Sequence, residues 1–357
     1  MSKTHYIIPF FIPHIGCPYN CVFCSQNRIT GKESSISPEE ILPTVKQYLA
    51  TFPRDAAGVE VAFFGGSFTG IPVKLQTAFL EKAHYAKKNG LIDGIRLSTR
   101  PDYIDGAILD RLKEFGVDTI ELGVQSANNK VLAQSLRGHT FEDVMRASKL
   151  IQKSGFVLGL QMMIGLPGSD RDTEMETARQ ICRIRPQMVR IYPALVIRGT
   201  ALEAMYRNGK YTPLSLDGAV QTCVILSEMF IRENIDIIRM GLQPTELINT
   251  GREVVAGPFH PAFRQLVDSR LLHKTVKKVI DQRGIETEAG LVIEVNPSIL
   301  STLQGSRKES IKALRAEYPG LHIRVLQNSS LDKTVIGFCN GDARYEIDYR
   351  QVISKTH

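Results

Sequence analysis

The sequence predicts an α/β protein: an open (βα)6 partial barrel of the TIM type, followed by a small C-terminal α/β domain. Apolar runs typical of strands alternate with amphipathic runs typical of helices. The strand runs are nearly continuous in apolar residues, as is usual for parallel strands covered on both faces. Six such runs can be counted, whereas a closed barrel of this type needs eight strands. An open, curved sheet therefore fits better.

The predicted strands and helices follow one another in a regular order along the chain. The six strands are expected at residues 6–14, 58–66, 94–101, 119–126, 157–167 and 188–196. The helices between them are expected at residues 74–90, 106–116, 141–155 and 171–184. This βα succession is typical of a parallel sheet with helices on its faces.

The pattern changes around residues 241–260, which are rich in glycine and proline and show no period. Such a segment marks the end of a regular structure, and the barrel is expected to end there. We predict three parts: a partial barrel over residues 1–250, a helical linker over 251–285 and a small α/β domain over 286–357.

The last of these parts reads as a strand, a helix, a turn, a helix and a strand, followed by one more strand at residues 334–340. This order resembles a KH domain, which holds a nucleic-acid backbone with a GXXG loop between two helices. Residues 305–308 (Gly-Ser-Arg-Lys) occupy that turn, with Lys308 in place of the second glycine. The alternative is a small α/β domain that only packs on the barrel.

Composition narrows the class of protein. The chain has 357 residues and a net charge of +7, which permits a polyanionic partner without requiring one. No apolar run approaches the length that spans a bilayer, and the N-terminus lacks the features of an export signal. Only six cysteines occur in this long chain, so a disulfide framework is not expected. The cytoplasm is the expected location.

Three of the six cysteines crowd into one short loop, with the spacing Cys17-x3-Cys21-x2-Cys24. Three thiolates can ligate three irons of a [4Fe–4S] cluster and leave the fourth iron open. An open coordination position is the mark of a catalytic metal site rather than a structural one. With His14 added, a zinc site with three cysteines and one histidine is the structural alternative.

The cysteine spacing, with Phe23 before the last cysteine, resembles the signature of the radical S-adenosylmethionine (SAM) superfamily. The resemblance implies that a [4Fe–4S] cluster on Cys17, Cys21 and Cys24 cleaves SAM to a 5′-deoxyadenosyl radical. It also implies that Gly65 and Gly66, followed by Ser67, meet the amino group of the methionine moiety. Glycine allows such a close approach because it has no side chain.

Polar residues and glycines at the ends of the later strands are further candidates for binding SAM or substrate. Ser98, Thr99 and Arg100 can offer hydrogen bonds to a ribose or a carboxylate. A charged residue inside an apolar strand needs a partner, so Glu121 is expected inside the barrel. The complete set, in which Gly159, Gln161 and Gly165 resemble the superfamily's adenine-binding element, is Ser98, Thr99, Arg100, Glu121, Gln125, Gly159, Gln161 and Gly165.

Several segments resemble one branch of the superfamily, the Elongator catalytic subunit: "GGSFTGIP", "STRPDYI", "ELGVQS", "LRGHT", "GLPGS" and "YPALVIRGTALEAMYRNGKY". In that family the radical chemistry modifies the wobble uridine of tRNA with a carboxymethyl group from acetyl-CoA. The resemblance places Arg137, His139 and Arg198 near substrate at the barrel mouth; the alternative is that they belong to ordinary solvated loops. We expect neither the family's N-terminal tRNA-binding region nor its acetyltransferase domain, which leaves the use of acetyl-CoA open.

The predicted function is therefore a radical SAM enzyme that modifies RNA, most simply tRNA. Its partners would be tRNA or another RNA and an electron donor such as flavodoxin or ferredoxin. Two alternatives stay open at the level of sequence. One is a radical SAM enzyme acting on a small molecule, as in the coproporphyrinogen dehydrogenase group, which these barrels also resemble. The other is a non-catalytic protein that binds zinc and RNA.

Overall fold

The computed structural model describes residues 5–12, 17, 19–25, 36–53, 56, 58–242, 252–285 and 290–354. Its contacts divide the chain into two compact units. We call residues 2–219 and 235–259 the barrel unit, and residues 220–234 and 260–357 the C-terminal unit.

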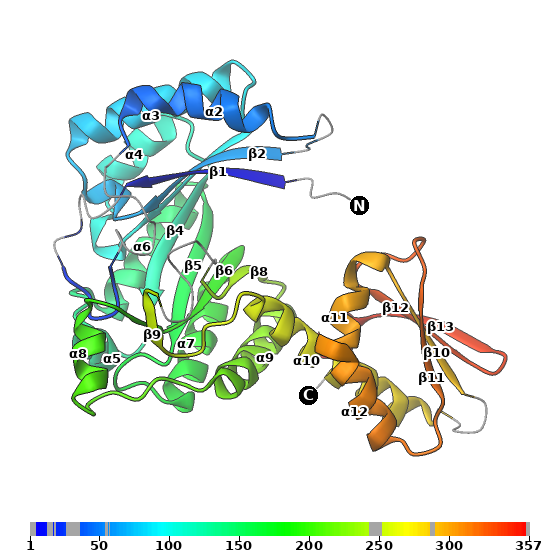
Figure 1. Ribbon diagram of the computed structural model, residues 1–357. Helices are drawn as coiled ribbons and strands as arrows, with labels where there is room; N and C mark the ends of the chain where they lie inside the picture. The colour runs from blue at the N-terminus through cyan, green and yellow to red at the C-terminus, as the bar shows by residue number, and fades with distance from the viewer. Residues whose placement is uncertain are drawn as a thin grey trace. The chain divides into compact units, whose positions relative to one another are not determined.

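The barrel unit is built on one parallel sheet of seven strands that curls into a half-barrel (Figure 1). The strands lie in chain order: β1 (His5–Ile12), β2 (Gly58–Gly65), β3 (Gly94–Thr99), β4 (Thr119–Gln125), β5 (Val157–Ile164), β6 (Met188–Pro193) and β8 (Asp236–Met240). The predicted fold class, an open partial barrel, is confirmed. The sheet has one strand more than predicted, because β8 pairs with β6 at its edge.

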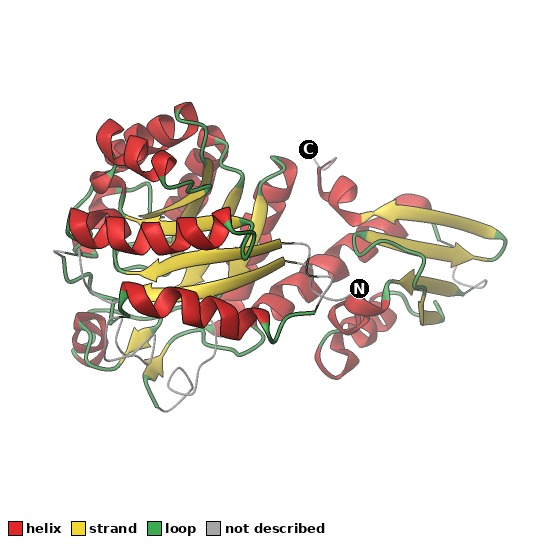
Figure 2. Cartoon of the chain, turned by 90° about the horizontal axis from the view of Figure 1, so that it is seen from above, coloured by secondary structure: helices red, strands yellow, loops and turns green. Residues whose placement is uncertain are grey.

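Helices run between the strands and pack along the sheet (Figure 2). The longer ones are α2 (Ile41–Leu49), α3 (Val73–Lys88), α4 (Gly106–Glu114), α6 (Phe141–Lys153) and α7 (Arg171–Ile184). Shorter ones are α5 (Asn129–Gln134), α8 (Ala201–Arg207) and the 3-10 turns η1 (Pro38–Glu40), η2 (Phe68–Gly70) and η3 (Pro101–Tyr103). Helix α9 (Leu216–Arg232) belongs mostly to the C-terminal unit. A two-stranded ribbon pairs β7 (Val196–Ile197) with β9 (Val254–Ala256).

The two faces of the half-barrel sheet differ in chemistry. On the helix-covered face, the ring centroid of Phe63 lies 6.0 Å from that of Phe10 and 5.8 Å from that of Phe79 on α3. The alternating residues point to the other face, where Arg96 forms ion pairs with Glu60 and Glu121. A strand that is buried on both faces thus carries apolar residues outward and paired charges inward.

The C-terminal unit contains a four-stranded sheet in the order β11-β10-β12-β13. Its elements are α10 (Phe263–Arg283), β10 (Leu291–Val295), η4 (Pro297–Ile299), α11 (Leu300–Gln304), η5 (Ser306–Lys308), α12 (Glu309–Glu317), β11 (Ile323–Gln327), β12 (Val335–Asn340), β13 (Ala343–Asp348) and α13 (Tyr349–Ser354). Strands β10 and β11 are parallel, and β10 and β12 antiparallel. The β10-to-β11 segment follows the predicted order; β13 and α13 were not predicted.

Helix α10, which the sequence analysis placed in a linker, is an integral part of the C-terminal unit. Leu272, Val276 and Val279 of α10 belong to the same buried cluster as Ile293 of β10 and Phe338 of β12. The turn between α11 and α12 has left-handed backbone at Gly305, Arg307 and Lys308. The likeness of this part to a KH domain and the domain limits stay predictions. In the part of the chain that the structure describes, no helix is long and apolar enough to cross a membrane.

Candidate functional site

The three loop cysteines follow β1, at the edge of the sheet where the parallel strands end. Cys21 is buried, and Cys17 and Cys24 are partly exposed. The backbone N–H of Cys24 donates to the carbonyl of Cys21 at 3.0 Å, which closes a turn between two of the predicted ligands. Within the described ranges, no three His, Cys, Asp or Glu side chains are arranged around one metal position. That the three cysteines bind a metal cluster stays a prediction; His14 lies outside the described residues.

The cysteine loop is held by the segment that follows α5. The N–H of Val22 donates to the carbonyl of Ser135 at 3.2 Å, and the carbonyl of Val22 accepts from the N–H of Leu202 at 2.8 Å. The Tyr19 ring lies directly on Gly138, where an added Cβ would be 2.3 Å from the ring. Residues 135–138 thus form a seat for residues 19–22.

Phe23 packs inward from the same loop. It contacts a cluster containing Val196 and Leu202, and a second containing Leu166 and Ala194. These contacts tie the loop to the ends of β5 and β6. The side chain therefore packs against protein, and its predicted contact with a cofactor stays a prediction.

The glycine pair after β2 has a structural reason as well as the predicted one. Gly65 has a φ of +102°, and an added Cβ would be 3.2 Å from the carbonyl oxygen of Ile12 on β1. The N–H of Gly66 donates to that same oxygen at 2.8 Å. A side chain at position 65 would be strained and crowded, so this turn needs glycine whether or not a ligand approaches it.

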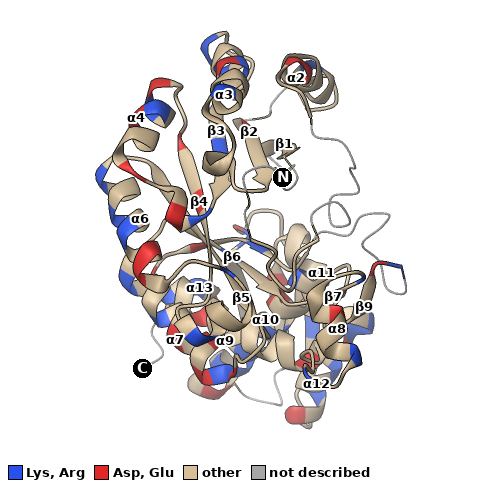
Figure 3. Ribbon diagram, turned by 90° about the vertical axis from the view of Figure 1, so that its left-hand side faces the viewer, with Lys and Arg blue, Asp and Glu red and all other residues tan. Residues whose placement is uncertain are grey.

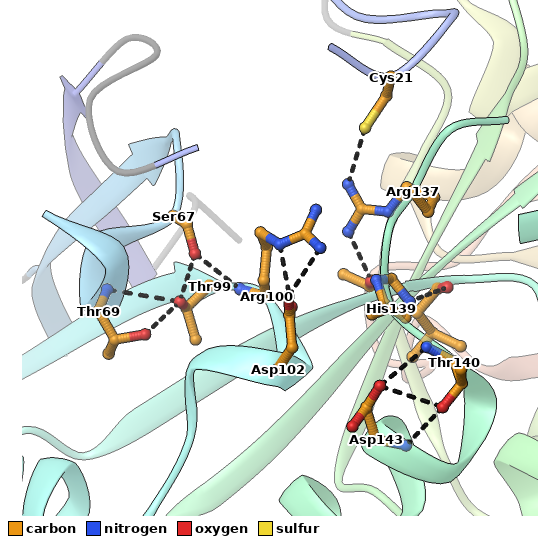
Figure 4. Close-up of polar contacts among 12 residues, drawn as sticks. Cys21, Ser67, Thr69, Thr99, Arg100, Asp102, Arg137, His139, Thr140 and Asp143 are labelled. Atoms are coloured by element: carbon orange, nitrogen blue, oxygen red, sulfur yellow. Dashed lines mark hydrogen bonds and ion pairs between the residues drawn. The ribbon is translucent and has the colours of Figure 1, made fainter. Parts of the chain in front are cut away.

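Ser67 and Thr99 link the ends of β2 and β3 (Figure 4). Their hydroxyl oxygens are 2.8 Å apart, and Ser67 Oγ accepts the backbone N–H of Arg100 at 3.0 Å. Thr99 Oγ1 also lies 2.5 Å from Thr69 Oγ1. These three side chains are buried and hydrogen-bond to one another. They therefore fix the backbone at the rim of the site.

Two arginines lie beside Cys21 (Figure 4). Arg100 forms a two-pronged ion pair with Asp102, with two N···O distances of 2.9 Å, and its guanidinium lies 4.5 Å from the centre of the Tyr19 ring. Arg137 donates from Nη1 to Cys21 Sγ at 3.4 Å and from Nη2 to the carbonyl of Gly123 at 2.9 Å. Among the residues that the structure describes, Arg100 Nη1 and Arg137 Nε are buried and have no hydrogen-bond partner.

Arg137 and His139 are not residues of a solvated loop. They are 7% and 4% exposed, and His139 Nε2 lies 3.3 Å from the carbonyl oxygen of Val124. Burial, followed by the nearby cations Arg137 and Arg100, lowers the pKa of His139 to about 3. The imidazole is therefore neutral, and its Nε2–H donates to Val124. Arg198, by contrast, is exposed on the β7–β9 ribbon and donates to the carbonyl of Arg252.

Glu121 lies in the middle of the sheet and is fully buried. Arg190 Nη2 and Arg96 Nη1 donate to it at 2.9 and 3.1 Å. Burial would raise the pKa of Glu121, but Arg190 and Arg96 hold it below its ordinary value. An added Cβ at Gly159 would be 2.9 Å from Glu121 Cγ, so glycine there makes room for this carboxylate. Direct contact of Glu121 with a ligand stays a prediction.

Gln161 connects this buried network to the rim. Its Nε2 donates to Glu121 at 3.0 Å and to Ser98 Oγ at 3.2 Å. Gln125, at the end of β4, is buried with a φ of +66°. The structure thus brings Ser98, Glu121 and Gln161 together on one face of the sheet.

Gly165 lies at the turn after β5, with a φ of +72°. Its N–H donates to Glu174 at 2.6 Å, and its carbonyl accepts from Tyr211 Oη at 2.6 Å. A pocket of about 240 Å³ lies beside this turn, lined in part by Lys210 and Tyr211. Hydrogen bonds from both sides hold the turn, and its predicted contact with adenine stays a prediction.

Sequence reasoning missed Arg96 and Arg190, which complete the Glu121 network, and Tyr19, which anchors the cysteine loop. The signal that selected Glu121, a charge inside an apolar strand, applies equally to Arg96 on β3 and Arg190 on β6. Nothing in the local sequence indicates that Tyr19 packs on Gly138, because that contact joins segments more than a hundred residues apart.

The sequence matches the Radical SAM superfamily over residues 11–181 and the Radical_SAM C-terminal domain over residues 186–273. It is 31% identical over 245 residues to the tRNA uridine(34) acetyltransferase of Methanocaldococcus jannaschii, which covers 57% of this chain and 45% of that protein. It is 30% identical over 253 residues to Elongator complex protein 3 of Homo sapiens, covering 60% of this chain and 46% of that protein. The chain spans about half the length of these curated relatives.

Among solved structures, the archaeal Methanocaldococcus infernus Elp3 with an N-terminal deletion matches with a TM-score of 0.61 and 21% identity. The match covers 84% of this chain and 68% of that one, which shows a shared fold. The resemblance predicted from the cysteine loop and the strand-end segments is confirmed. The chain belongs to the radical SAM superfamily and is homologous to the Elp3/tRNA uridine(34) acetyltransferase family.

Proposed function

We propose that this chain is an enzyme that holds a [4Fe–4S] cluster on Cys17, Cys21 and Cys24, cleaves SAM and modifies tRNA. The observation that carries the cofactor part is Arg137, a buried cation whose Nη1 is directed at Cys21 Sγ. A buried charge is costly unless it is paired and hydrogen-bonded, and a thiolate-bound cluster would supply the partner of opposite sign.

The residues around the cysteine loop fit the two proposed ligands, the [4Fe–4S] cluster and SAM. Arg100 Nη1 and Arg137 Nε are buried donors that meet no acceptor in the described ranges of the chain, which suits a carboxylate or another anionic group. Nε2 of Gln161 is engaged by Glu121 and Ser98, while its Oε1 makes no hydrogen bond within the described part of the chain. That oxygen is the natural acceptor for a ribose hydroxyl.

Cys17, Cys21 and Cys24 would hold the cluster, which would supply the one-electron reduction that cleaves SAM into methionine and a 5′-deoxyadenosyl radical. The role of the protein's own residues would be to orient SAM and the cluster and to exclude water from them. Residues 135–138 fix the cysteine loop, and Glu121 with Arg96 holds Gln161 in place. A flavodoxin or ferredoxin would supply the electron, and the cytoplasm is the proposed location.

The proposal of a tRNA substrate is supported by the relatives, which are named tRNA uridine(34) acetyltransferase. The net charge of +7 is compatible with a polyanion. Figure 3 shows Lys and Arg interspersed with Asp and Glu on helices such as α4 and α7, so the charge is spread rather than gathered there. The basic turn at 305–308 is a second candidate contact with RNA.

The cofactor proposal is tested by SAM cleavage. Anaerobically reconstituted protein, reduced with dithionite, is expected to convert SAM to 5′-deoxyadenosine. Cys21→Ala should lose this activity because it removes a ligand, whereas Cys182→Ala, in α7 and outside the loop, should keep it. Full turnover by C17A, C21A and C24A alike would refute the assignment.

The substrate proposal is tested by mass spectrometry of tRNA nucleosides from cells with and without the gene. We expect one modified uridine to disappear in the deletion and to return with the wild-type gene but not with C21A. An unchanged nucleoside profile, in cells whose protein still cleaves SAM, would contradict the tRNA proposal and favour a small-molecule substrate.

A further inference from the structure

In the part of the structure that is described, Arg137 differs from the other buried arginines near the site in having no carboxylate partner. It is 7% exposed, and its two hydrogen bonds go to Cys21 Sγ and the carbonyl of Gly123. Within the described residues, no Asp or Glu pairs with it. Arg100, Arg96 and Arg190 each have a carboxylate at hydrogen-bond distance.

The position of Arg137 is fixed by its surroundings. Its backbone N–H donates to the carbonyl of Leu132 at 3.0 Å. Gly123 leaves room for the guanidinium, because an added Cβ there would be 3.0 Å from Arg137 Nη2. The neighbouring His139 is neutral, since its pKa is lowered to about 3 by burial and by the two arginines. The charged group that donates to Cys21 is therefore Arg137. Arg100, the other arginine beside Cys21, is paired with Asp102.

Hydrogen bonds to cluster sulfurs and local charge are among the factors that set the potential of an iron–sulfur centre. Reduction by one electron adds one negative charge to the cluster. A cation that donates to a ligand sulfur stabilises the more negative form, and hydrogen bonds from charged donors are about twice as strong as neutral ones.

We propose that Arg137 sets the reduction potential of the cluster by donating a charged hydrogen bond to Cys21 Sγ. This inference rests on the proposed function for the presence of the cluster and goes beyond it in assigning the control of its potential to one residue. Arg137 is thus a tuning residue that acts through a ligand. It raises the potential so that one electron from a flavodoxin- or ferredoxin-type donor can enter.

The test is an EPR-monitored redox titration of the full chain without SAM, comparing wild type, Arg137→Lys and Arg137→Gln. R137Q loses the charge and is expected to shift the midpoint to a more negative potential by at least a tenfold change in the reduction equilibrium, which for one electron is about 59 mV. R137K keeps the positive charge but lacks the planar guanidinium, so its midpoint potential should fall between those of the wild type and R137Q. Arg146→Met on α6, whose exposed side chain pairs with Asp143, is the matched control and should titrate like wild type.

Each outcome decides the proposal. A cluster-loaded R137Q that titrates at the wild-type potential would overturn it, even if SAM binds less well, because Arg137 would then serve SAM alone. If a folded R137Q holds no iron but R137K loads, R137K carries the test: a midpoint more negative than that of the wild type supports the proposal, and the wild-type midpoint overturns it. If neither variant loads iron, Arg137 serves the fold and the proposal fails. Failure of the wild type to load would instead refute the proposed function.

Discussion

The two groups of buried arginines in the barrel unit lead to different conclusions. In the middle of the sheet, Arg96 and Arg190 share Glu121, and Arg96 also pairs with Glu60. At the rim, Arg137 has a thiol and a backbone carbonyl as its partners. Breaking a buried ion pair such as those of Glu121 is expected to destabilise the fold. A buried charge that the protein leaves without a counter-ion indicates where a ligand of opposite sign binds.

The strongest test of this comparison is Glu121→Gln. It leaves two buried guanidinium groups without their shared carboxylate, so we expect a loss of about 3–5 kcal/mol in the free energy of unfolding, measured by urea denaturation. Because the pKa of Glu121 is lowered in the fold, this contribution is present at neutral pH and is lost as the pH falls through the folded-state pKa. Glu176→Gln, in an exposed pair, should cost at most about 1 kcal/mol. A similarly small loss for E121Q would break the comparison.

A second test uses the pH dependence of stability that His139 imposes. Its pKa is lowered from 6.5 to about 3, so the unfolded chain takes up the proton first as the pH falls. Stability should decrease between pH 6 and pH 4 by up to about 1.4 kcal/mol per pH unit from this group. His139→Gln keeps a donor for Val124 and should remove that part of the slope. Parallel pH profiles of the two proteins would show that His139 does not titrate as described.

The smallest expected effect concerns the seat of the cysteine loop. Gly138→Ala places a Cβ into the Tyr19 ring at a φ of +72°, whereas Gly209→Ala meets nothing within 4 Å at a φ of +68°. Both substitutions carry a similar backbone strain of about 1–3 kcal/mol. The additional loss in G138A then measures the packing of Tyr19, and iron content after reconstitution should fall in G138A only. Equal stability and equal iron in the two variants would show that the seat does not position the loop.

The open barrel and most of its strands could be predicted because their signals are local. A short stretch of sequence is enough to recognise apolar runs, glycine turns and the spacing of Cys17, Cys21 and Cys24. Strand β8 (Asp236–Met240) was not predicted because it is only five residues long and partly exposed, and it forms a strand by pairing with β6. Helix α10 looked like a linker for the same reason: its partners, such as Ile293 and Phe338, come later in the chain.

The sequence by itself determined the fold class, the family and the three cysteines, since each depends on residue types at short spacing. Only the tertiary structure decided which charges are compensated. The register of the parallel strands sets Glu121 opposite Ser98 and Gly159, within reach of Arg96 and Arg190. The chain path after α5 brings Arg137 to Cys21. Whether a buried arginine meets a carboxylate or a thiol depends on neighbours distant in sequence, and no local pattern records them.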